Sequence, residues 1–407
     1  MKTKLILLFQ LSVLLLTITQ HANSQWTQQS GGLNADRTIR AFDSLGTNLL
    51  AATNDNGVYI STNNGSAWTQ SGLVGLQVNA LIAKDNTILA GVQDYPPGAG
   101  GVYVSTNNGT SWVRVGSNYT VLSLAILGNN ILAGTHLDGL LRSTNNGANF
   151  SSISIGSNTI NALKVAGSNI FAGVNDSGVY VSTNNGANWT STTLNNKTVL
   201  SLTVSGTNIF AGTYDSGVYF SSNNGATWTQ TSLGGNYYIL SMASRGNNIF
   251  AGTYGFGIFH SSNNGTTWTQ KNEGFFSAYS IYDIAIKFNY VYAGTISGSV
   301  WRRVYSNMIA GVQQTSSITP AAFLLNQNYP NPFNPETKIN FSIPKTSNTV
   351  LKVFNTNGAE VQTLVNQNLQ AGTYSVEFGN TNLTSGIYFY TLTSGEFKET
   401  KKMILVK

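Results

Sequence analysis

One eight-residue pattern recurs along the first two thirds of the chain and constrains its fold more than any other feature. The first copy of this box is Ser-Thr-Asn-Asn-Gly-Ser-Ala-Trp at residues 61–68, and near copies occupy 105–112, 143–150, 182–189, 221–228 and 261–268. The glycines of successive boxes are 44, 38, 39, 39 and 40 residues apart. A period near 40 in a strand-rich chain is typical of β-propeller blades, each of which is a four-stranded sheet.

Each repeat divides into four short strands, as residues 198–230 illustrate. The segments TVLSLTV, IFAGTY, VYFSS and ATWTQ are rich in β-branched and aromatic residues, and short Gly/Asn turns separate them. The box is then the hairpin between the third and fourth strands, where Asn and Gly tolerate positive φ and the Trp fills space against a neighbouring strand. We expect a structural role for Asn63, Gly65, Trp68, Asn107, Gly109, Trp112, Asn145, Gly147, Asn184, Gly186, Trp189, Asn223, Gly225, Trp228, Asn263, Gly265 and Trp268.

The number of blades follows from a second signature. An Ala-Ala/Gly-Thr/Val triplet on the second strand occurs seven times, from Ala51 to Ala293, and the last unit ends after its third strand. The N-terminal segment WTQQSGGL (26–33) matches the fourth-strand segment WTQSGL (68–73). We therefore expect the N-terminus to supply the missing strand, which closes the ring and removes an open edge. This predicts a seven-bladed propeller over residues 25–303.

The remaining residues differ in pattern. Residues 304–322 have no strong periodicity and are expected to form a linker. Residues 323–407 contain about seven short strands with turn signals, which predicts a small Ig-like β-sandwich. The fold class expected for the whole chain is therefore all-β.

The box resembles the Asp-box (BNR-like) repeat, whose pattern is Ser-x-Asp-x-Gly-x-Thr-Trp. Asn stands at the Asp position in all six copies, and Phe150 replaces one Trp. Asn can make the same turn hydrogen bonds, so the departure leaves the fold inference intact. The resemblance implies that the box is structural and lies away from any active site.

Residues 323–407 resemble the C-terminal sorting domain of the type IX secretion system of Bacteroidetes. The matching features are Asn-Tyr-Pro-Asn-Pro-Phe-Asn-Pro (328–335), the Asn-Gly turn at 357–358, Ser-Gly-Ile-Tyr (385–388) and the terminal Lys-Lys-Met-Ile-Leu-Val-Lys. The resemblance implies that the type IX machinery is a partner, and that the domain directs passage across the outer membrane and is usually cleaved. The alternative is an accessory β-sandwich, for instance one that binds sugar.

Residues 1–24 are expected to be a cleaved secretory signal. Lys2 and Lys4 precede the apolar run 5–18, and Ala22-Asn23-Ser24 supplies small residues before the cleavage site. No second stretch of about 18 apolar residues exists, so no transmembrane helix is predicted. We therefore expect Sec export followed by type IX secretion, to the outer cell surface or the medium.

Composition excludes several kinds of site. The chain has no cysteine, which rules out thiol nucleophiles and thiolate metal sites. Its net charge of +6 includes Lys2 and Lys4; residues 26–303 and 304–407 each carry only +2, too little for a nucleic-acid surface. The segment Asn-Asp-Asn-Gly (54–57) lacks the spaced carboxylates and closing Glu of a calcium loop. No cofactor or metal is expected.

Asp-box propellers include sialidases, but this sequence lacks the residues that a sialidase site needs. Such an enzyme needs three convergent arginines and a Tyr-Glu pair, but the arginines fall on unrelated strands and Glu273 is the only glutamate in 26–303. Other glycosidases need two carboxylates across a cleft. Asp55, Asp94, Asp176 and Asp215 recur at one place in the second-to-third strand loop, as turn formers would. A glycoside hydrolase or lyase with an unrecognised carboxylate pair stays open as an alternative.

The loops on one face of the predicted ring are rich in aromatic residues. Tyr95, Tyr214, Tyr254 and Phe256 follow second strands, and Tyr237, Tyr238, Phe275, Phe276 and Tyr279 lie in fourth-to-first connections. His136 is alone on the same face. Asp283 stands where the other first strands carry Ala or Ser, close to the expected axis. Because exposed rings stack on sugars or anchor protein partners, we expect ligand contacts at Tyr95, His136, Tyr214, Tyr254, Phe256 and Asp283.

Three functions remain open at this stage. The leading hypothesis is a secreted or surface-attached, non-catalytic binding or adhesion protein with a glycan or protein ligand on the loop face. The second is the hydrolase or lyase, acting on an extracellular polysaccharide. The third is a structural component of the cell surface or matrix with no small ligand.

Overall fold

The structure is a computed structural model that describes residues 25–33, 38–116, 118–275, 280–296, 299–309, 312–334, 336–379 and 383–406. The predicted secretory signal, residues 1–24, lies outside the described residues. The chain divides into two compact units, Met1–Met308 and Ile309–Lys407. Within the described residues, none of the helices has the length and apolar character needed to cross a membrane.

The described part of the first unit contains seven four-stranded antiparallel sheets. The first strands are Ile39–Leu45 (β2), Val78–Lys84 (β6), Val121–Leu127 (β10), Ile160–Ala166 (β14), Val199–Ser205 (β18), Ile239–Arg245 (β22) and Ile281–Lys287 (β26). The second strands are Asn48–Thr53 (β3), Thr87–Val92 (β7), Asn130–Thr135 (β11), Asn169–Val174 (β15), Asn208–Thr213 (β19), Asn248–Thr253 (β23) and Tyr290–Thr295 (β27). The third strands are Val58–Ser61 (β4), Gly101–Ser105 (β8), Leu140–Ser143 (β12), Gly178–Ser182 (β16), Val218–Ser221 (β20), Ile258–Ser261 (β24) and Val300–Val304 (β28).

The fourth strands are only two or three residues long. They are Thr69–Gln70 (β5), Val113–Val115 (β9), Ser151–Ile153 (β13), Thr190–Ser191 (β17), Thr229–Gln230 (β21) and Thr269–Gln270 (β25), together with Thr27–Gln28 (β1). β1 pairs antiparallel with β28, with Thr27 opposite Arg302 and Gln28 opposite Trp301. The last sheet is therefore assembled from both ends of this part of the chain. Such short outer strands offer little edge for another chain to pair with.

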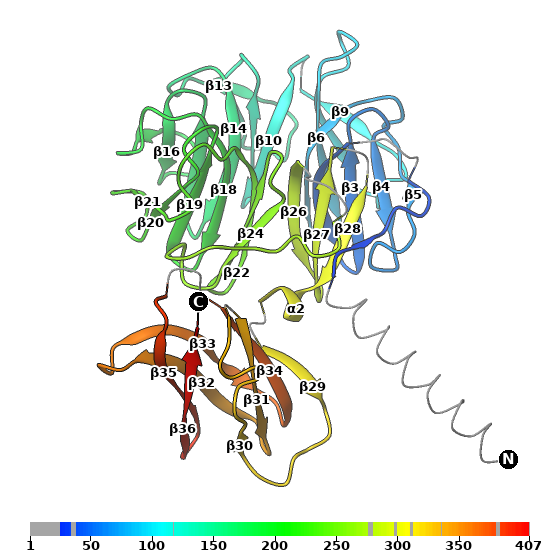
Figure 1. The fold of residues 1–407 in the computed structure, drawn as a ribbon. Coiled ribbons are helices and arrows are strands. Elements are labelled where there is room, and N and C mark those ends of the chain that lie inside the picture. The colour runs from blue at the N-terminus through cyan, green and yellow to red at the C-terminus, as the bar shows by residue number, and fades with distance from the viewer. Residues whose placement is uncertain are drawn as a thin grey trace, which may run out of the picture. The chain divides into compact units, whose positions relative to one another are not determined.

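The sheets form a closed ring around their first strands. Each first strand contacts the first strand of the next sheet, and β26 contacts β2. Figure 1 shows these sheets as the blue-to-yellow part of the ribbon. The all-β fold built from repeated four-stranded sheets confirms the predicted fold class.

The Ala-Gly-Thr signature reflects how closely neighbouring sheets pack. The second strands are buried at every position after the first. A Cβ added at Gly212 would lie 2.3 Å from the Ser201 hydroxyl and 2.5 Å from a methyl of Ile239 in the next sheet. Glycine is needed there because any side chain would push two sheets apart.

The box is a hydrogen-bonded hairpin in each of its copies. In the first, the Ser61 hydroxyl accepts from the Gly65 amide at 2.8 Å and donates to Asn63 Oδ1, which also accepts from the Ala67 amide. Asn64 and Gly65 both have positive φ. The Trp68 ring is buried, and its indole N–H donates to the Gln29 carbonyl at 2.9 Å.

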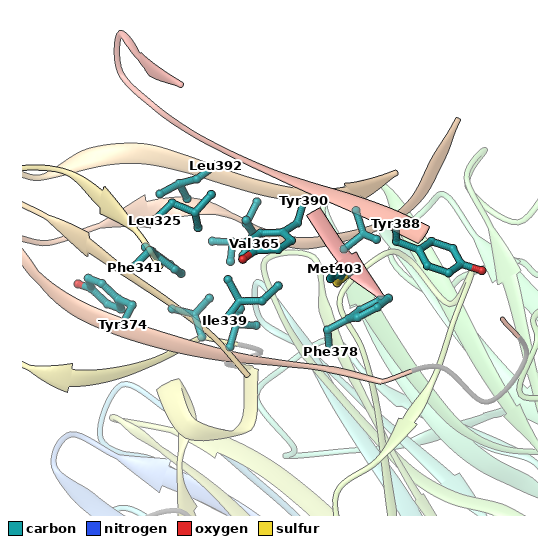
Figure 2. Packing of buried hydrophobic residues seen from close by; sticks show 14 of the residues in the cluster. Leu325, Ile339, Phe341, Val365, Tyr374, Phe378, Tyr388, Tyr390, Leu392 and Met403 are labelled. Carbon is teal, nitrogen blue, oxygen red and sulfur yellow. The ribbon is translucent and has the colours of Figure 1, made fainter. Parts of the chain in front are cut away.

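The second unit contains two four-stranded sheets, ordered β29-β34-β31-β30 and β33-β32-β35-β36. The strands are Val312–Ser316 (β29), Leu324–Leu325 (β30), Glu336–Ile343 (β31), Ser347–Asn355 (β32), Glu360–Leu369 (β33), Gly372–Gly379 (β34), Gly386–Ser394 (β35) and Phe397–Leu405 (β36). Figure 2 shows the buried core that both sheets supply, including Phe341, Tyr390 and Met403. The Tyr390 hydroxyl donates to the Asn326 carbonyl and accepts from the Asn328 amide, each at 2.8 Å, which anchors the proline-rich segment.

Part of the segment 304–322, which was expected to be a linker, forms regular secondary structure instead. Tyr305–Ile309 is a short helix (α2) of the first unit, in which Met308 is fully buried and the Tyr305 hydroxyl donates to the Arg245 carbonyl. β29 pairs with β34 in the second unit. Elements this short have no readable periodicity, and their partners are distant in sequence, so local pattern could not reveal them.

Candidate functional site

Seven equivalent positions surround one mouth of the ring. At each, the residue after the second strand donates its amide to the carbonyl just before the first strand of the same sheet. The distances are 2.9–3.3 Å from the amides of Asn54, Gln93, His136, Asn175, Tyr214, Tyr254 and Ile296. We call these the rim positions. Because their backbone geometry repeats, only their side chains distinguish one sheet from another.

The rim is polar on one side and apolar on the other. The first four sheets present Asn54, Gln93, His136 and Asn175, whereas the last three present Tyr214, Tyr254 and Ile296. Tyr214 is 50% exposed, and Tyr254 and the nearby Phe256 are each 51% exposed. Large apolar side chains exposed together on an otherwise even scaffold mark this side as the candidate contact surface.

Three tyrosines form a continuous row on the apolar side. The rings of Tyr214 and Tyr238 stack with centroids 4.4 Å apart, and Tyr254 lies 6.1 Å beyond Tyr238. Phe256 meets Tyr237 edge-on at 5.1 Å. A hydrogen bond with Tyr214 raises the pKa of Tyr238. We call Tyr214, Tyr238 and Tyr254 the tyrosine row.

The structure brings only some of the predicted contact residues together. Tyr214, Tyr254 and Phe256 cluster in neighbouring sheets, whereas Tyr95 and His136 are exposed in the second and third sheets. Tyr95 is in no described ring contact with the row. Tyr238 was named from the sequence only as one of several connection aromatics. Phe276 and Tyr279 lie outside the described residues.

The loop aspartates make hydrogen bonds within or beside their own loops. Asp94 accepts from the Gly98 and Gly100 amides at 2.7 and 2.8 Å. Asp176 accepts from the Thr198 hydroxyl at 2.6 Å, and Asp215 accepts from the Ser216 hydroxyl at 2.8 Å. The described residues contain no group of three His, Asp or Glu side chains that could hold a metal ion.

The described arginines do not converge on one point. Arg40 donates to Asn54 Oδ1, Arg245 donates to the carbonyls of Phe288 and Ile286, and Arg303 pairs with Glu273 at 2.6 Å. Arg114 donates to the Gly98 carbonyl in a loop of its own sheet, and Arg142 donates to the Asn185 carbonyl of the next sheet. Arg37 lies outside the described residues. No three-arginine carboxylate site is formed by the arginines that the structure describes.

A central channel of about 720 Å³ runs through the ring and is lined by all seven first strands. Asp283 on β26 faces it, and one of its carboxylate oxygens accepts from the Phe42 amide of β2 at 2.6 Å. Burial raises the pKa of Asp283 to about 7, although the amides of Phe42 and Ile284 act in the opposite direction. The residue singled out from the sequence therefore joins the last sheet to the first.

Three further charged residues in the channel were missed from the sequence. Asp43 pairs with Lys287 at 2.5 Å and accepts from the Ala83 amide at 2.7 Å. Lys164 on β14 is open to the channel, but the surrounding ring lowers the pKa of its ammonium by desolvation. The aligned first strands contain the signal: two positions after that of Asp283, they carry Asp43, Ile82, Ala125, Lys164, Thr203, Ala243 and Ala285.

Comparisons with known proteins fit this architecture. Residues 327–407 match the secretion system C-terminal sorting domain family. No curated protein matches the chain. YCF48 from Cyanidioschyzon merolae has a similar structure, with a TM-score of 0.56 and 14% identity over 70% of this chain and 99% of that one.

Two GH74 enzymes are also similar in structure. The Niastella koreensis enzyme gives a TM-score of 0.55 and 17% identity, and the Xanthomonas campestris xyloglucanase gives 0.53 and 13%. Each alignment covers 78% of this chain and 59% of the enzyme. At such identities the likeness establishes the β-propeller fold alone. The chain thus combines a β-propeller with a C-terminal sorting domain of the type IX secretion system, which directs it to the cell surface or the extracellular space.

Proposed function

We propose that the exported propeller is a non-catalytic binding protein whose ligand packs on the tyrosine row and Phe256. The observation that carries this proposal is the clustering of these half-exposed rings on one side of an otherwise regular rim. Tyrosine combines a large apolar face with a hydroxyl, which suits contact surfaces that are partly wet.

A neutral glycan chain fits this surface best. The C–H faces of pyranose rings pack on aromatic rings, while sugar hydroxyls bond to phenol groups. The carboxylate of Asp215 acts electrostatically on Tyr238. This negative charge disfavours a polyanion beside the row. A protein ligand is the alternative, and YCF48 has been solved with a bound peptide.

A hydrolase acting on extracellular polysaccharide is the competing function. It requires two carboxylates placed across a sugar-binding cleft. The described loop carboxylates Asp94, Asp176 and Asp215 instead make hydrogen bonds within or beside their own loops. A purely structural surface component would make no use of a cluster of exposed rings in neighbouring sheets.

The test is retention of the full chain on a panel of insoluble polysaccharides, with released reducing sugar measured in the same wells. The double change Tyr214→Ala/Tyr254→Ala should weaken retention at least tenfold. The matched control is Gln93→Ala/Asn175→Ala, which alters two rim positions on the polar side. Equal loss in both double variants, or no retention of the native protein, would contradict a glycan site on the row. Sugar release by the native protein would overturn the non-catalytic role.

We further infer that the repeat is an Asp-box with Asn in the Asp position, in a seven-bladed propeller spanning 25–303 that precedes a sorting domain at 323–407. Asn63 Oδ1 supports this because it bonds both the Ser61 hydroxyl and the Ala67 amide. The equivalent Asn residues make the same bonds in the other five boxes. Replacing Asn184 with Asp should keep the fold and its melting temperature, whereas Asn184→Ala should lower it.

A further inference from the structure

The channel contains charge that the ring does not need for its closure. Asp43 and Lys287 are accounted for, because they brace the junction of the last, first and second sheets through their ion pair and the Ala83 amide. Lys164 lies in the fourth sheet, far around the ring from that junction. Among the described residues its ammonium makes no hydrogen bond or ion pair, although it acts electrostatically on Asp283.

Asp283 is larger and more polar than the residues at the equivalent position of the other first strands, which are Ala or Ser. Three other sheets carry serine there, and Ser123, Ser201 and Ser241 donate their hydroxyls to carbonyls of the next sheet at 3.0–3.3 Å. A hydroxyl or a methyl therefore suffices at this position. Asp283 instead places a carboxylate in the channel, where burial disfavours its ionised form. Although this carboxylate also joins the last sheet to the first through the Phe42 amide, a buried ionisable group that faces an open channel is a candidate ligand contact.

The space between these two groups suits a small molecule. The channel volume of about 720 Å³ lies within the range of roughly 300–1,000 Å³ that is typical of ligand pockets. Its lining is mainly Ala, Ser, Thr and aliphatic side chains, with Arg40 and Tyr282 among its residues. Lys287 is paired with Asp43, and the Arg40 guanidinium is oriented by Asn54, whereas Lys164 makes no hydrogen bond or ion pair among the described residues.

We propose that the channel is a second ligand site, separate from the tyrosine row, that takes a small hydroxy acid. The ligand's carboxylate pairs with Lys164, and a hydroxyl beside it donates to Asp283. Uronic acids have this chemistry, either as free monosaccharides or as the acidic end of a glycan chain. The site does not depend on the proposed function of the rim, because it shares no residue with the row.

The charges around Asp283 give the site a defined pH dependence. The groups that act on it are Asp43, Lys164 and the amides of Phe42 and Ile284, and Lys287, Arg40 and Tyr282 line the same channel. Protonation of Asp283 removes a negative charge that repels the ligand. Binding should therefore tighten as the pH falls from 8 to 6, and Asp283→Asn should make it nearly independent of pH in that range.

The experiment is titration calorimetry of the full chain with sodium glucuronate, with a tetra-galacturonate and with glucose, at pH 6 and 8. We expect both acids or one of them to bind and glucose not to bind. Lys164→Met should weaken binding at least tenfold. The matched control is Lys84→Met, a first-strand lysine that does not line the channel and bonds the Gly128 carbonyl instead.

The outcomes separate the sources of the ligand and can overturn the proposal. Binding of glucuronate indicates a free acid, and binding of the oligosaccharide alone indicates the end of a glycan. Absence of binding by both acids would show a channel that holds only water. Equal affinity in the Lys164→Met variant would also refute the site. A second readout is acylation of Lys164 by an amine reagent, followed by mass spectrometry, which bound glucuronate should slow in the native protein.

Discussion

Removing the charge of Asp283 should stabilise the propeller at neutral and alkaline pH. In the native protein the Asp283 carboxylate accepts from the Phe42 amide at 2.6 Å. Asp283→Asn keeps an oxygen that can accept this bond but has no ionised form. The folded-state pKa of about 7, against an ordinary value of 3.8, is a difference of about 3 units. At about 1.4 kcal/mol per unit, this sets a ceiling of about 4 kcal/mol. Because Asp283 is partly accessible to solvent, we expect roughly 1–2 kcal/mol.

The direction of the effect follows from proton linkage. Since the folded pKa lies above the unfolded value, the native state holds the proton more tightly between about pH 4 and pH 7. The contribution of Asp283 to the free energy of unfolding therefore falls as the pH rises through that window. Below about pH 4 both states are protonated, so the gain of the variant should vanish there. Above about pH 7 the gain should be constant.

Tryptophan fluorescence can follow this effect in the full chain. All seven tryptophans, from Trp26 to Trp301, belong to the first unit, so urea unfolding monitored in this way reports on the propeller. The quantity to compare is the difference in free energy of unfolding between Asp283→Asn and the native protein at pH 4, 5, 6, 7 and 8. A difference that does not change with pH, or a variant that is less stable at pH 8, would refute the reasoning. Asp215→Asn, at an exposed loop position, is the matched control variant.

Two further predictions concern other buried groups. His260 is buried with its ring nitrogen 2.9 Å from Asn248 Oδ1, and burial lowers its pKa to about 3. Its contribution to the free energy of unfolding is therefore lost as the pH falls below about 6.5, where the unfolded state takes up a proton. In urea unfolding, His260→Phe should be more stable than the native protein at pH 5 and not at pH 8. Phe220 already occupies the equivalent place in the preceding sheet and packs on Phe210, so the replacement should fit. The Ser182 hydroxyl is fully buried in a box, accepts from the Gly186 amide and donates to Asn184 Oδ1. Ser182→Ala should lower the free energy of unfolding by about 1–3 kcal/mol, whereas Asn188→Ala in the same hairpin should change it little. Equal effects of the two changes would contradict a structural role for the box serine.

The repeated architecture could be predicted because its determinants are local. Strand alternation recurs in each sheet, and the positive-φ Asn-Gly turn and the close-packed glycine recur in six of the seven sheets, at a spacing of about 40 residues. The helix α2 and the strand β29 could not be predicted, because their partners, such as Arg245 and Val376, are remote in sequence. The stacking of Tyr238 between Tyr214 and Tyr254 was missed for a similar reason, since it depends on the spacing of adjacent sheets.

The charged residues of the channel follow from the way the ring closes, with one exception. The junction between the last and first sheets differs from the others: Asp283 accepts from Phe42, Asp43 pairs with Lys287, and the Tyr292 hydroxyl and the Arg302 guanidinium both donate to the Asn64 carbonyl. Other junctions use single hydroxyls, such as the Ser201 hydroxyl on the Ile239 carbonyl, or a cationic side chain on a carbonyl, such as Arg142 on Asn185. The ion pair between Asp43 and Lys287 thus lies where the two ends of the repeat array meet.

Lys164 is not part of that closure. It lies on β14, in a sheet that joins its neighbour through other residues, for example the Ser123 hydroxyl on the Ile160 carbonyl. If Lys164 served stability, Lys164→Met would lower the free energy of unfolding, whereas desolvation of the ammonium makes us expect an unchanged or slightly higher value. A variant that is as stable as the native protein and no longer binds glucuronate would separate the two roles of channel charge. A variant that unfolds more easily would assign Lys164 to the scaffold.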